Sequence, residues 1–490
     1  MSENKKTVIF FIIIVAINLI IFYPSFSFSA KADHITYLME TAGIENLAES
    51  INQTYSFCRT RIVYAGDRIL FRPIFYLLLS VEKFLFGYNF VYWQITGFLF
   101  HLIIVGLLLR LFNAIQPHIF SWIFTLFYSV IYIGSDLVTW HHMHGYLLFL
   151  IFMLLALIHF VLYIKNDQKD RKDLWFMGLY LLGACFTNEF GIIVSAIILL
   201  TLLGHRRIIL KRPFIHSAKV ERGACWTNNP FMLMIPPISY LYVSFLDYTL
   251  RFSGGGPENK LIGLNLVFDV AKLIGQFIIL FSASFILPFS PGVFKIFTDD
   301  KNYALFLHLP DIMNFDIYLR IMFFLNVGIF IAAFGALGFV VFNFIKLRRK
   351  IRLKDSIGEK KPARNILTVI LLGSAMLAGY IAVLVIFRTS DKDLFYVTNN
   401  LYHFYILSLL AVIVIYGLFL LVENFLGDKK EKFRRLVLTV LCLGAFLNGL
   451  QVYQLNRSGR EMFSSWGQYV RKIERFVNTH KHEKDFSYRF

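Results

Sequence analysis

The chain has 490 residues, of which 57% are hydrophobic and only 16% are charged, and its mean hydropathy is +0.62. Soluble globular domains carry about 25% charged residues, so this composition excludes an ordinary soluble protein. The formal net charge is +18, but Lys and Arg cluster in short loops between apolar runs, which argues against nucleic acid as a partner. We therefore expect a multi-pass protein of the lipid bilayer.

Apolar runs follow one another along most of the chain, and many approach the ~20 residues needed to cross ~30 Å of hydrocarbon. They predict an all-α, polytopic membrane protein with about eleven transmembrane helices and further interfacial helices in its outer loops. No convincing small-residue cleavage site follows the first run, which indicates a retained helix rather than a signal peptide. The predicted spans are Thr7–Phe26, Val91–Phe112, His118–Gly134, Gly145–Ile164, Leu174–Phe186, Phe190–Gly204, Pro230–Tyr248, Ile317–Phe344, Ile366–Phe387, Leu401–Leu421 and Leu436–Tyr453.

Residues 27–90 separate the first two spans and form the first extracytoplasmic loop of this scheme. Within the loop, the apolar stretch Phe71–Phe86 is interrupted by charged residues and by Pro73, which favours a helix lying on the membrane surface. We expect residues 1–453 to form one transmembrane domain and residues 454–490 to form a short extracytoplasmic tail.

The basic loops predict which side of the membrane each segment faces. Lys and Arg are enriched in cytoplasmic loops of membrane proteins, so we place Lys5, Lys6 and these loops inside. The N-terminus and all four basic loops share one side only if Leu261–Phe289 makes no net crossing, as an interfacial helix or a re-entrant pair. The loops are Lys165–Asp173, His205–Arg222, Lys346–Arg364 and Asp428–Arg435.

The stretch Leu174–Gly204 has a polar centre, "FTNEF". As one helix it would be ~46 Å long, too long for a single comfortable span. A carboxylate deep in hydrocarbon costs at least ~2.5 kcal/mol, so we expect a tight hairpin that brings Glu189 to the outer face. The same face then receives Asp33, His34 and the loop "GSDLVTWHHMHGY", which contains His141 and His142.

Arginines in the first outer loop depart from the charge rule. Arg59, Arg61, Arg68 and Arg72 are all predicted to lie outside. Long loops are translocated largely regardless of charge, which is one explanation. The other is that a guanidinium at this depth binds a lipid-linked phosphate through its planar fork of donors. Arg72 is the best candidate, because it directly precedes the apolar helix that begins at Pro73.

Asp33 is the candidate general base. Transfer of a sugar from a lipid phosphate to a hydroxyl group needs one group to accept the proton and a cation to hold the departing phosphate. The alternative role of Asp33 is an N-cap for the helix "HITYLME". Tyr37, in that helix, is by default an interfacial aromatic.

Metal ligation finds little support in the sequence. His141 and His144 share one helical face, but an interfacial belt of aromatic and His side chains explains them better. The four cysteines are scattered without metal-like spacing. We predict no metal site, and the sequence leaves open whether a divalent metal is required.

Three passages in order resemble the GT-C superfamily of integral-membrane glycosyltransferases, which includes protein O-mannosyltransferases and lipid-A aminoarabinose transferases. They are "KADHITYL", "FRPIFYLLLSVEKFLFGYNFVYWQITGFLFHLIIVGLLLRLF" and "LLGACFTNEFGIIVSAIILL". A later stretch, "KDLFYVTNNLYHFYILSLL", is faintly similar to a fourth family passage but lacks its Arg. The chain also has Gln94 and Gly97 where His and Asn are expected, and Asn188 where Lys is usual.

The resemblance implies a polyprenyl- or dolichyl-phosphate sugar as donor, inversion at the anomeric carbon, and a protein, lipid or glycan as acceptor. It implies that Asp33 is the base and that the reaction takes place on the outer face of a cell membrane, which we expect to be bacterial or archaeal. No cofactor is implied with certainty. The candidate substrate-binding residues are Arg72, Glu189, His34, Tyr37, His141, His142, Arg59 and Arg61.

Two alternative functions remain open at this stage. A polymerase or ligase of lipid-linked polysaccharide would also place Arg on outer loops. A transporter or flippase is less favoured, because its ionisable residues are expected near span midpoints, often with an internal repeat. In this sequence the ionisable residues gather at the outer ends of the spans, and no repeat stands out.

Overall fold

The computed structural model describes most of the helical part of the chain. Seven helices within it are long and apolar enough to cross a membrane, by length and composition. The described residues are 3–29, 34, 37–38, 41, 46–64, 71–132, 135–167, 170–209, 230–252, 270–286, 288, 294–299, 302–307, 335, 361–388, 403–426 and 429–480.

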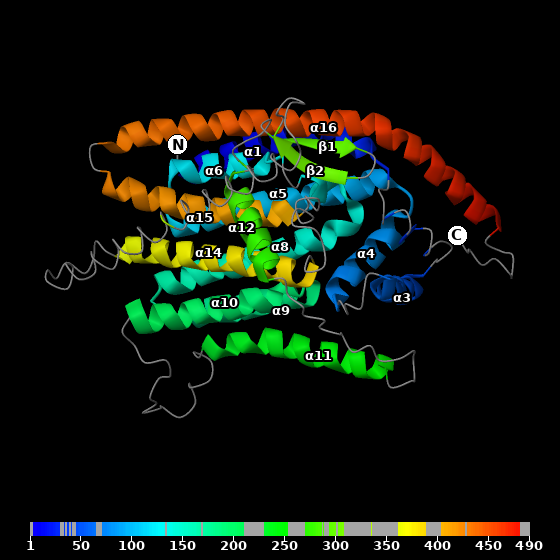
Figure 1. Cartoon of the computed structure of the whole chain (residues 1–490), viewed down its shortest axis with the longest axis horizontal. Helices are drawn as coiled ribbons and strands as arrows, with labels where there is room; N and C mark the ends of the chain where they lie inside the picture. The colour runs from blue at the N-terminus through cyan, green and yellow to red at the C-terminus, as the bar shows by residue number, and fades with distance from the viewer. Residues whose placement is uncertain are drawn as a thin grey trace.

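Long helices run roughly side by side and form the body of the molecule (Figure 1). In chain order up to residue 209 the elements are α1 (Glu3–Phe22), η1 (Tyr23–Ser27), α3 (Leu47–Tyr64), α4 (Pro73–Phe86), α5 (Phe90–Ile115), α6 (Ile119–Ser129), α7 (Asp136–Thr139), η2 (His141–Met143), α8 (His144–Lys165), α9 (Arg171–Thr187), α10 (Phe190–Gly204) and η3 (His205–Ile209). The later elements are η4 (Pro230–Met234), α11 (Ile235–Phe252), α12 (Val270–Ile286), β1 (Phe294–Asp299), β2 (Asn302–Leu307), α14 (Lys361–Arg388), α15 (His403–Phe425) and α16 (Lys430–His480).

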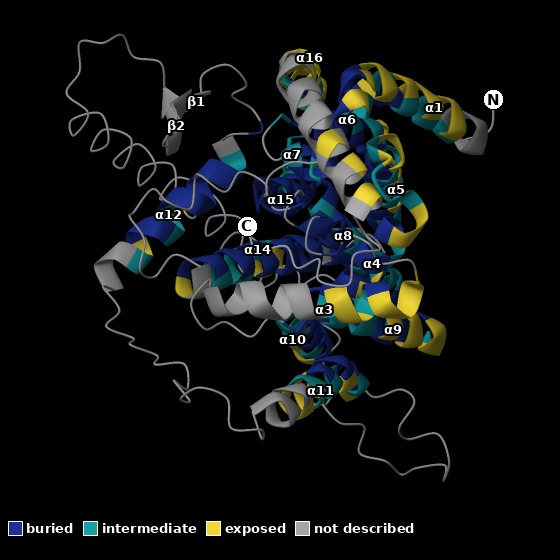
Figure 2. Cartoon of the chain, turned by 90° about the vertical axis from the view of Figure 1, so that its right-hand side faces the viewer, coloured by how far each residue is buried: buried dark blue, intermediate teal, exposed yellow. Residues whose placement is uncertain are grey.

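Burial grades from the centre of the bundle to its surface (Figure 2). The apolar windows of α8 and α15 are 72% and 83% buried, whereas those of α1 and α16 are only 28% buried. All four windows are apolar around the whole helix, so the outer pair exposes apolar side chains such as Ile20 and Phe446. A helix that is apolar all round is stable at a surface only when that surface faces lipid.

The predicted all-α fold is confirmed for the described residues, with one antiparallel hairpin, β1–β2, as an addition. The count of eleven spans is not reproduced. Helix α6 has only 11 residues and α9 has 17, so both are shorter than a comfortable span. Helix α12 lies crosswise to the long helices (Figure 1), unlike a segment that crosses once. The predicted span Ile317–Phe344 lies outside the described residues.

The described ends of the basic loops meet at the end of the bundle that holds the N-terminus (Figure 1). We call this the inner end and the opposite end the outer end, after the predicted topology. At the inner end the buried carboxylate of Glu423 accepts a hydrogen bond from Arg434 Nε at 2.6 Å and lies 3.2 Å from Lys430 Nζ and 3.4 Å from His118 Nε2. This cluster joins α15 and α16 to the turn between α5 and α6.

Helices α3 and α4 cover the outer end, where α4 packs against α8 and α9. The prediction that α4 lies on the membrane surface stays a prediction. Within the protein, Arg72, Glu82 and Lys83 are all buried, because α3 covers α4 and Lys83 Nζ donates to the Thr41 carbonyl oxygen. The polar groups of α4 thus face the protein interior.

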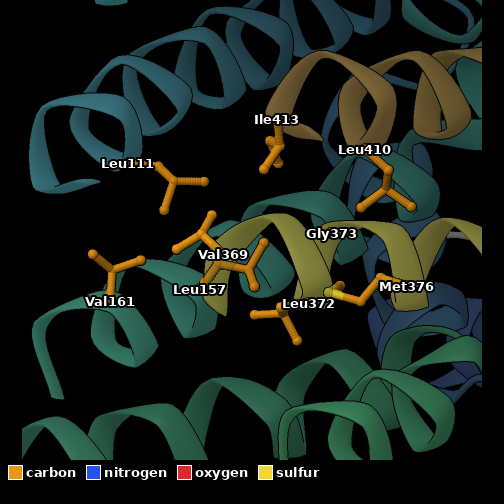
Figure 3. Close-up of a pocket in the computed structure, with 9 residues that line it drawn as sticks. All are labelled: Leu111, Leu157, Val161, Val369, Leu372, Gly373, Met376, Leu410 and Ile413. Atoms are coloured by element: carbon orange, nitrogen blue, oxygen red, sulfur yellow. The ribbon is translucent and has the colours of Figure 1, made fainter. Parts of the chain in front are cut away.

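A small pocket of about 10 Å³ lies deeper in the bundle, between α5, α8, α14 and α15 (Figure 3). Its lining side chains, which include Leu111, Leu157, Met376 and Leu410, are all apolar. A sugar needs hydrogen-bonding partners, so this pocket is not a candidate sugar site.

Candidate functional site

A buried ion pair stands at the outer end of the bundle. Arg72 donates from Nε to Glu189 Oε2 at 2.6 Å and from Nη2 to Glu189 Oε1, so the pair is bidentate. Arg72 Nη1 donates to the Tyr146 hydroxyl oxygen at 3.1 Å. The guanidinium carbon lies 5.3 Å from the centre of the Tyr146 ring and 6.0 Å from that of Phe75. Residues from the start of α4, from α8 and from the turn between α9 and α10 therefore meet at the Arg72 cation.

Local sequence explains how the two partners reach each other. Arg72 is the residue before α4, and Pro73 in the first turn is compatible with a helix start because its missing N–H would have no partner there. Glu189 lies in the tight turn between α9 and α10, where Asn188 Oδ1 accepts the Phe190 N–H at 3.0 Å. The predicted hairpin at "FTNEF" is thus present, and it presents Glu189 towards α4.

The ion pair changes the electrostatics of the arginine. Burial alone would lower the pKa of the Arg72 guanidinium, because it penalises the charged form. Burial is the largest single influence, but the Glu189 carboxylate together with Tyr146 and Tyr76 outweighs it, and the net effect raises the pKa of Arg72 well above its ordinary value. Arg72 therefore remains a fixed cation at the outer end, and any anion that binds it must compete with Glu189.

A tyrosine–histidine pair borders this ion pair. The Tyr380 hydroxyl lies 2.8 Å from His403 Nδ1, and the His403 ring stands edge-on to the Tyr146 ring, with 6.3 Å between their centroids. His403 begins α15 and is buried. It belongs to the stretch "LYHFYILSLL", whose resemblance to a family passage lacked an Arg, and sequence reasoning gave it no role.

A second buried polar cluster surrounds the start of α8. His144 Nδ1 lies 2.7 Å from Glu82 Oε1, and both side chains are almost fully buried. A histidine beside a carboxyl group pairs with it through one ring nitrogen, which leaves His144 Nε2 on the other side of the ring. Neither this nitrogen nor Glu82 Oε2 has a hydrogen-bond partner among the described residues. A Cβ atom at Gly97 would lie only 2.7 Å from Nε2, so Gly97 provides the room for the imidazole.

The Gln94 side chain orients another histidine of the loop. Its Nε2 donates to the Thr139 carbonyl oxygen at 3.1 Å and lies 2.5 Å from His141 Nε2. Because an amide nitrogen only donates, the neutral His141 ring accepts through Nε2 and carries its proton on Nδ1. Gln94, which departs from the family pattern, therefore fixes the tautomer of His141.

His34 extends this cluster into the first outer loop. Its ring stands edge-on to Trp93, with centroids 4.4 Å apart, and to His141 at 4.9 Å. It is fully buried, and neither ring nitrogen has a hydrogen-bond partner among the described residues. Burial lowers the pKa of His34 well below its usual value, with smaller contributions from His142 and His144. The ring is therefore neutral near pH 7.

The other predicted site residues have different positions. The Tyr37 hydroxyl lies 2.9 Å from Thr54 Oγ1 and donates to the Leu79 carbonyl oxygen at 3.3 Å, so it joins its segment to α3 and α4. His142 is half-buried and stands edge-on to Trp140.

Asp33 and Arg68 lie outside the described residues. Arg59 and Arg61 belong to α3, but their side chains are outside the described part.

The described residues contain no group of three or more His, Cys, Asp or Glu side chains arranged to hold a metal ion. Sequence reasoning missed Glu82 and His403 as members of the two clusters. A usable signal for Glu82 was its place in an apolar helix, since a carboxylate on such a helix is expected to have a buried partner.

The comparisons with known proteins return structures only. No family model and no curated protein matches the sequence. The chain is similar to the Archaeoglobus fulgidus oligosaccharyltransferase, solved with a tethered acceptor peptide, at 12% identity and a TM-score of 0.44, covering 93% of this chain and 55% of that one. A second structure of that enzyme, AglB, contains an inhibitory peptide and a dolichol-phosphate and has the same identity and TM-score.

ArnT from Cupriavidus metallidurans, bound to undecaprenyl phosphate, is similar at 12% identity and a TM-score of 0.32, covering 85% of this chain and 78% of that one. The present chain thus spans about half the length of the archaeal enzyme. These structures are of the kind that the sequence motifs resemble. At such low similarity the function has to be argued from the residues of this chain.

Proposed function

We propose that the protein is a membrane glycosyltransferase that moves a sugar from a polyprenyl- or dolichyl-phosphate donor to an acceptor hydroxyl group. The observation that supports this most is the buried Arg72 guanidinium at the outer end, where two hydrogen bonds to Glu189 and one to Tyr146 hold it in place. A planar cation at this position matches the oxygens of a lipid-linked phosphate.

The proposed reaction is a single displacement. The acceptor oxygen attacks the anomeric carbon from the face opposite the phosphate, and the bond between that carbon and the phosphate oxygen breaks. The electron pair leaves with the lipid phosphate, whose charge Arg72 stabilises. The proton of the acceptor hydroxyl passes to Asp33, and the anomeric configuration is inverted.

Asp33 is proposed as the base because of its position in the sequence, directly before His34. The His34 ring is held between Trp93 and His141 at the outer end. Glu82 and His144 are proposed to support this segment from below, because their pair fixes the start of α8 beside His141. The proposed acceptor is a protein, lipid or glycan. The proposed location is the outer face of a bacterial or archaeal membrane.

The donor site is tested by sugar transfer from purified polyprenyl-phosphate sugars in detergent. We expect Arg72→Ala to raise the donor KM strongly and Arg72→Lys to have a smaller effect, because an ammonium group retains the charge but not the fork. Arg110→Ala is the control, since Arg110 is an exposed residue of α5. If the donor KM of Arg72→Ala is unchanged, Arg72 does not bind the lipid phosphate.

The base is tested by Asp33→Asn. General-base catalysis contributes about 10²–10⁴ in rate, so we expect kcat to fall by that order while the donor still binds. Asn caps a helix about as well as Asp, so a residue that acts only as an N-cap would tolerate the change. Near-normal transfer by this variant would assign Asp33 to capping and direct attention to Glu189.

A further inference from the structure

We propose that Glu189 is an internal substitute for the donor phosphate, and that the lipid phosphate binds Arg72 by displacing it. This inference rests on the proposed function and assigns Glu189 a role opposite to that of a supporting ligand. In this structure Glu189 occupies the position on Arg72 that the phosphate requires, so it sets how tightly the donor and the released lipid phosphate are held.

The hydrogen bonds of the guanidinium favour this exchange. Arg has five N–H donors, and two oxygens of a single anion can bind in parallel either at the end edge, formed by Nη1 and Nη2, or at the side edge, formed by Nε and Nη2. In this protein both oxygens of Glu189 occupy the side edge, and Tyr146 takes one further donor on Nη1. A phosphate can bind the same edge bidentately only after the carboxylate has left.

Glu189 is the partner that is able to move. Its side chain is 29% exposed, whereas that of Arg72 is 7% exposed. Arg72 is also held by the Tyr146 hydroxyl and by the faces of two aromatic rings. Glu189 lies in the turn between α9 and α10, outside the body of either helix.

The energetics predict the direction of the effect. Removing one partner of a buried ion pair leaves the other charge without compensation, which destabilises the protein. In a Glu189→Gln variant this cost falls on the empty state, and an anion that binds Arg72 relieves it. Anion affinity should therefore rise when the carboxylate is removed, and Glu189→Asp should give a smaller rise because the shorter side chain pairs less well with Arg72.

The experiment measures binding of undecaprenyl monophosphate, the corresponding polyprenol and inorganic phosphate to the purified full-length protein in detergent. We expect the wild type to prefer the monophosphate over the alcohol, and Glu189→Gln to bind the monophosphate about tenfold more tightly. Glu189→Asp should be intermediate and Arg72→Ala should lose the preference. Asp173→Asn is the matched control, because Asp173 also pairs with a nitrogen-containing side chain, that of His159, but at the inner end.

The outcomes separate the two proposals. If the wild type and all variants bind the lipid phosphate no better than the alcohol, the proposed donor is wrong. If the wild type prefers the monophosphate and Arg72→Ala does not, but Glu189→Gln binds equally or more weakly, Glu189 supports the site and the exchange is wrong. If Glu189→Gln binds inorganic phosphate more tightly but does not prefer the monophosphate lipid over the alcohol, an anion does displace Glu189 from Arg72. The proposal of a lipid-linked donor is then wrong. If Glu189→Gln fails to fold, the affinity of Glu189→Asp for the monophosphate is the test. A higher affinity than that of the wild type supports the exchange, and an equal or lower affinity contradicts it.

Discussion

At the residue scale, the outer end combines several buried groups whose protonation depends on their neighbours. Glu82 is the clearest case, because one of its oxygens lies beside His144 and the other has no partner among the described residues. Burial raises the pKa of the Glu82 carboxyl above its ordinary value of 4.5, and His144 only partly opposes this. Helix α4 ends four residues further along, at Phe86, so this carboxyl lies near the point where the first outer loop joins the bundle.

The raised pKa of Glu82 makes the stability of the protein depend on pH. A buried acid of this kind favours folding at low pH, and its contribution is lost as pH rises from about 4.5 through the raised folded-state pKa. Glu82→Gln removes the titration, so the variant should gain stability relative to the wild type between pH 5 and pH 8. Each unit of pKa shift corresponds to about 1.4 kcal/mol.

Thermal unfolding of both proteins across that pH range is the measurement. Asp173→Asn serves as the control, because its pair with His159 joins α8 to the start of α9 near the inner end. A stability difference between Glu82→Gln and the wild type that does not change with pH would show that the carboxyl keeps its charge throughout.

Single residues were predicted from the sequence with mixed success. A histidine inside an apolar run favours hydrogen bonds between helices, and His101 forms them with Tyr405 at 2.6 Å and with Asn18 at 3.1 Å. Arg72 was predicted as a surface cation. Its partner Glu189 is 117 residues away, and pairing at that separation depends on tertiary packing, which no local pattern contains.

At the element scale, close helix contacts position the histidine cluster. A Cβ atom added at Gly97 of α5 would overlap the carbonyl oxygen of Val138 in α7 and crowd His144. A backbone oxygen cannot rotate away as a side chain can, so α5 and α7 approach each other only because this residue is glycine. The contact brings η2, with His141, against α5.

Gly97→Ala should therefore separate α5 from α7. We expect a loss of about 1–3 kcal/mol in the free energy of unfolding, the usual cost of overpacking, and reduced sugar transfer. Gly106→Ala is a matched control in the same helix, because its nearest neighbour would be the Phe11 ring at 3.4 Å, an ordinary contact. Thermal unfolding and transfer rates of the two variants give the comparison, and equal behaviour would mean that α7 shifts freely.

Helix positions were more predictable than helix lengths. Apolar runs identified α1, α5, α8, α10, α14, α15 and α16, because a run of that length has one stable solution in lipid. The α6 region was predicted as His118–Gly134, but the helix ends at Ser129. There the Ser129 carbonyl oxygen and hydroxyl bond His101 and Asn18, and such side-chain partners on other helices are invisible in a local apolar pattern.

At the scale of the whole molecule, the two ends of the bundle carry different chemistry. The inner end holds the described parts of the basic loops and the Glu423 cluster, and the outer end holds the Arg72–Glu189 pair and the histidines. Lys and Arg counts in short loops report orientation, so we predict that the inner end faces the cytoplasm. The same rule predicts that cysteines introduced at positions 256 and 300, which lie outside the described residues, are labelled from one side.

Helix α16 offers the sharpest test of this orientation. Its 51 residues correspond to ~76 Å of helix, more than twice the ~30 Å of hydrocarbon in a membrane. The apolar part, Lys430–Arg457, is long enough to cross, so residues 458–480 must extend beyond the bilayer. They run past the outer end, on the side of α3 and α4 (Figure 1), and their described side chains, such as Lys472, are exposed.

Cysteine labelling in intact cells with a membrane-impermeant maleimide tests this arrangement, in a background without the four native cysteines. We expect Lys472→Cys on α16 and Glu49→Cys on α3 to be labelled from outside, since both residues are exposed beyond the outer end. Asp170→Cys, in the turn between α8 and α9, is the inner control and should react only after the membrane is permeabilised. Labelling of Lys472→Cys and Asp170→Cys from the same side would mean that α16 does not cross as described. Labelling of Asp170→Cys alone in intact cells would invert the molecule and place the Arg72–Glu189 pair in the cytoplasm, where a donor displayed on the outer face could not reach it.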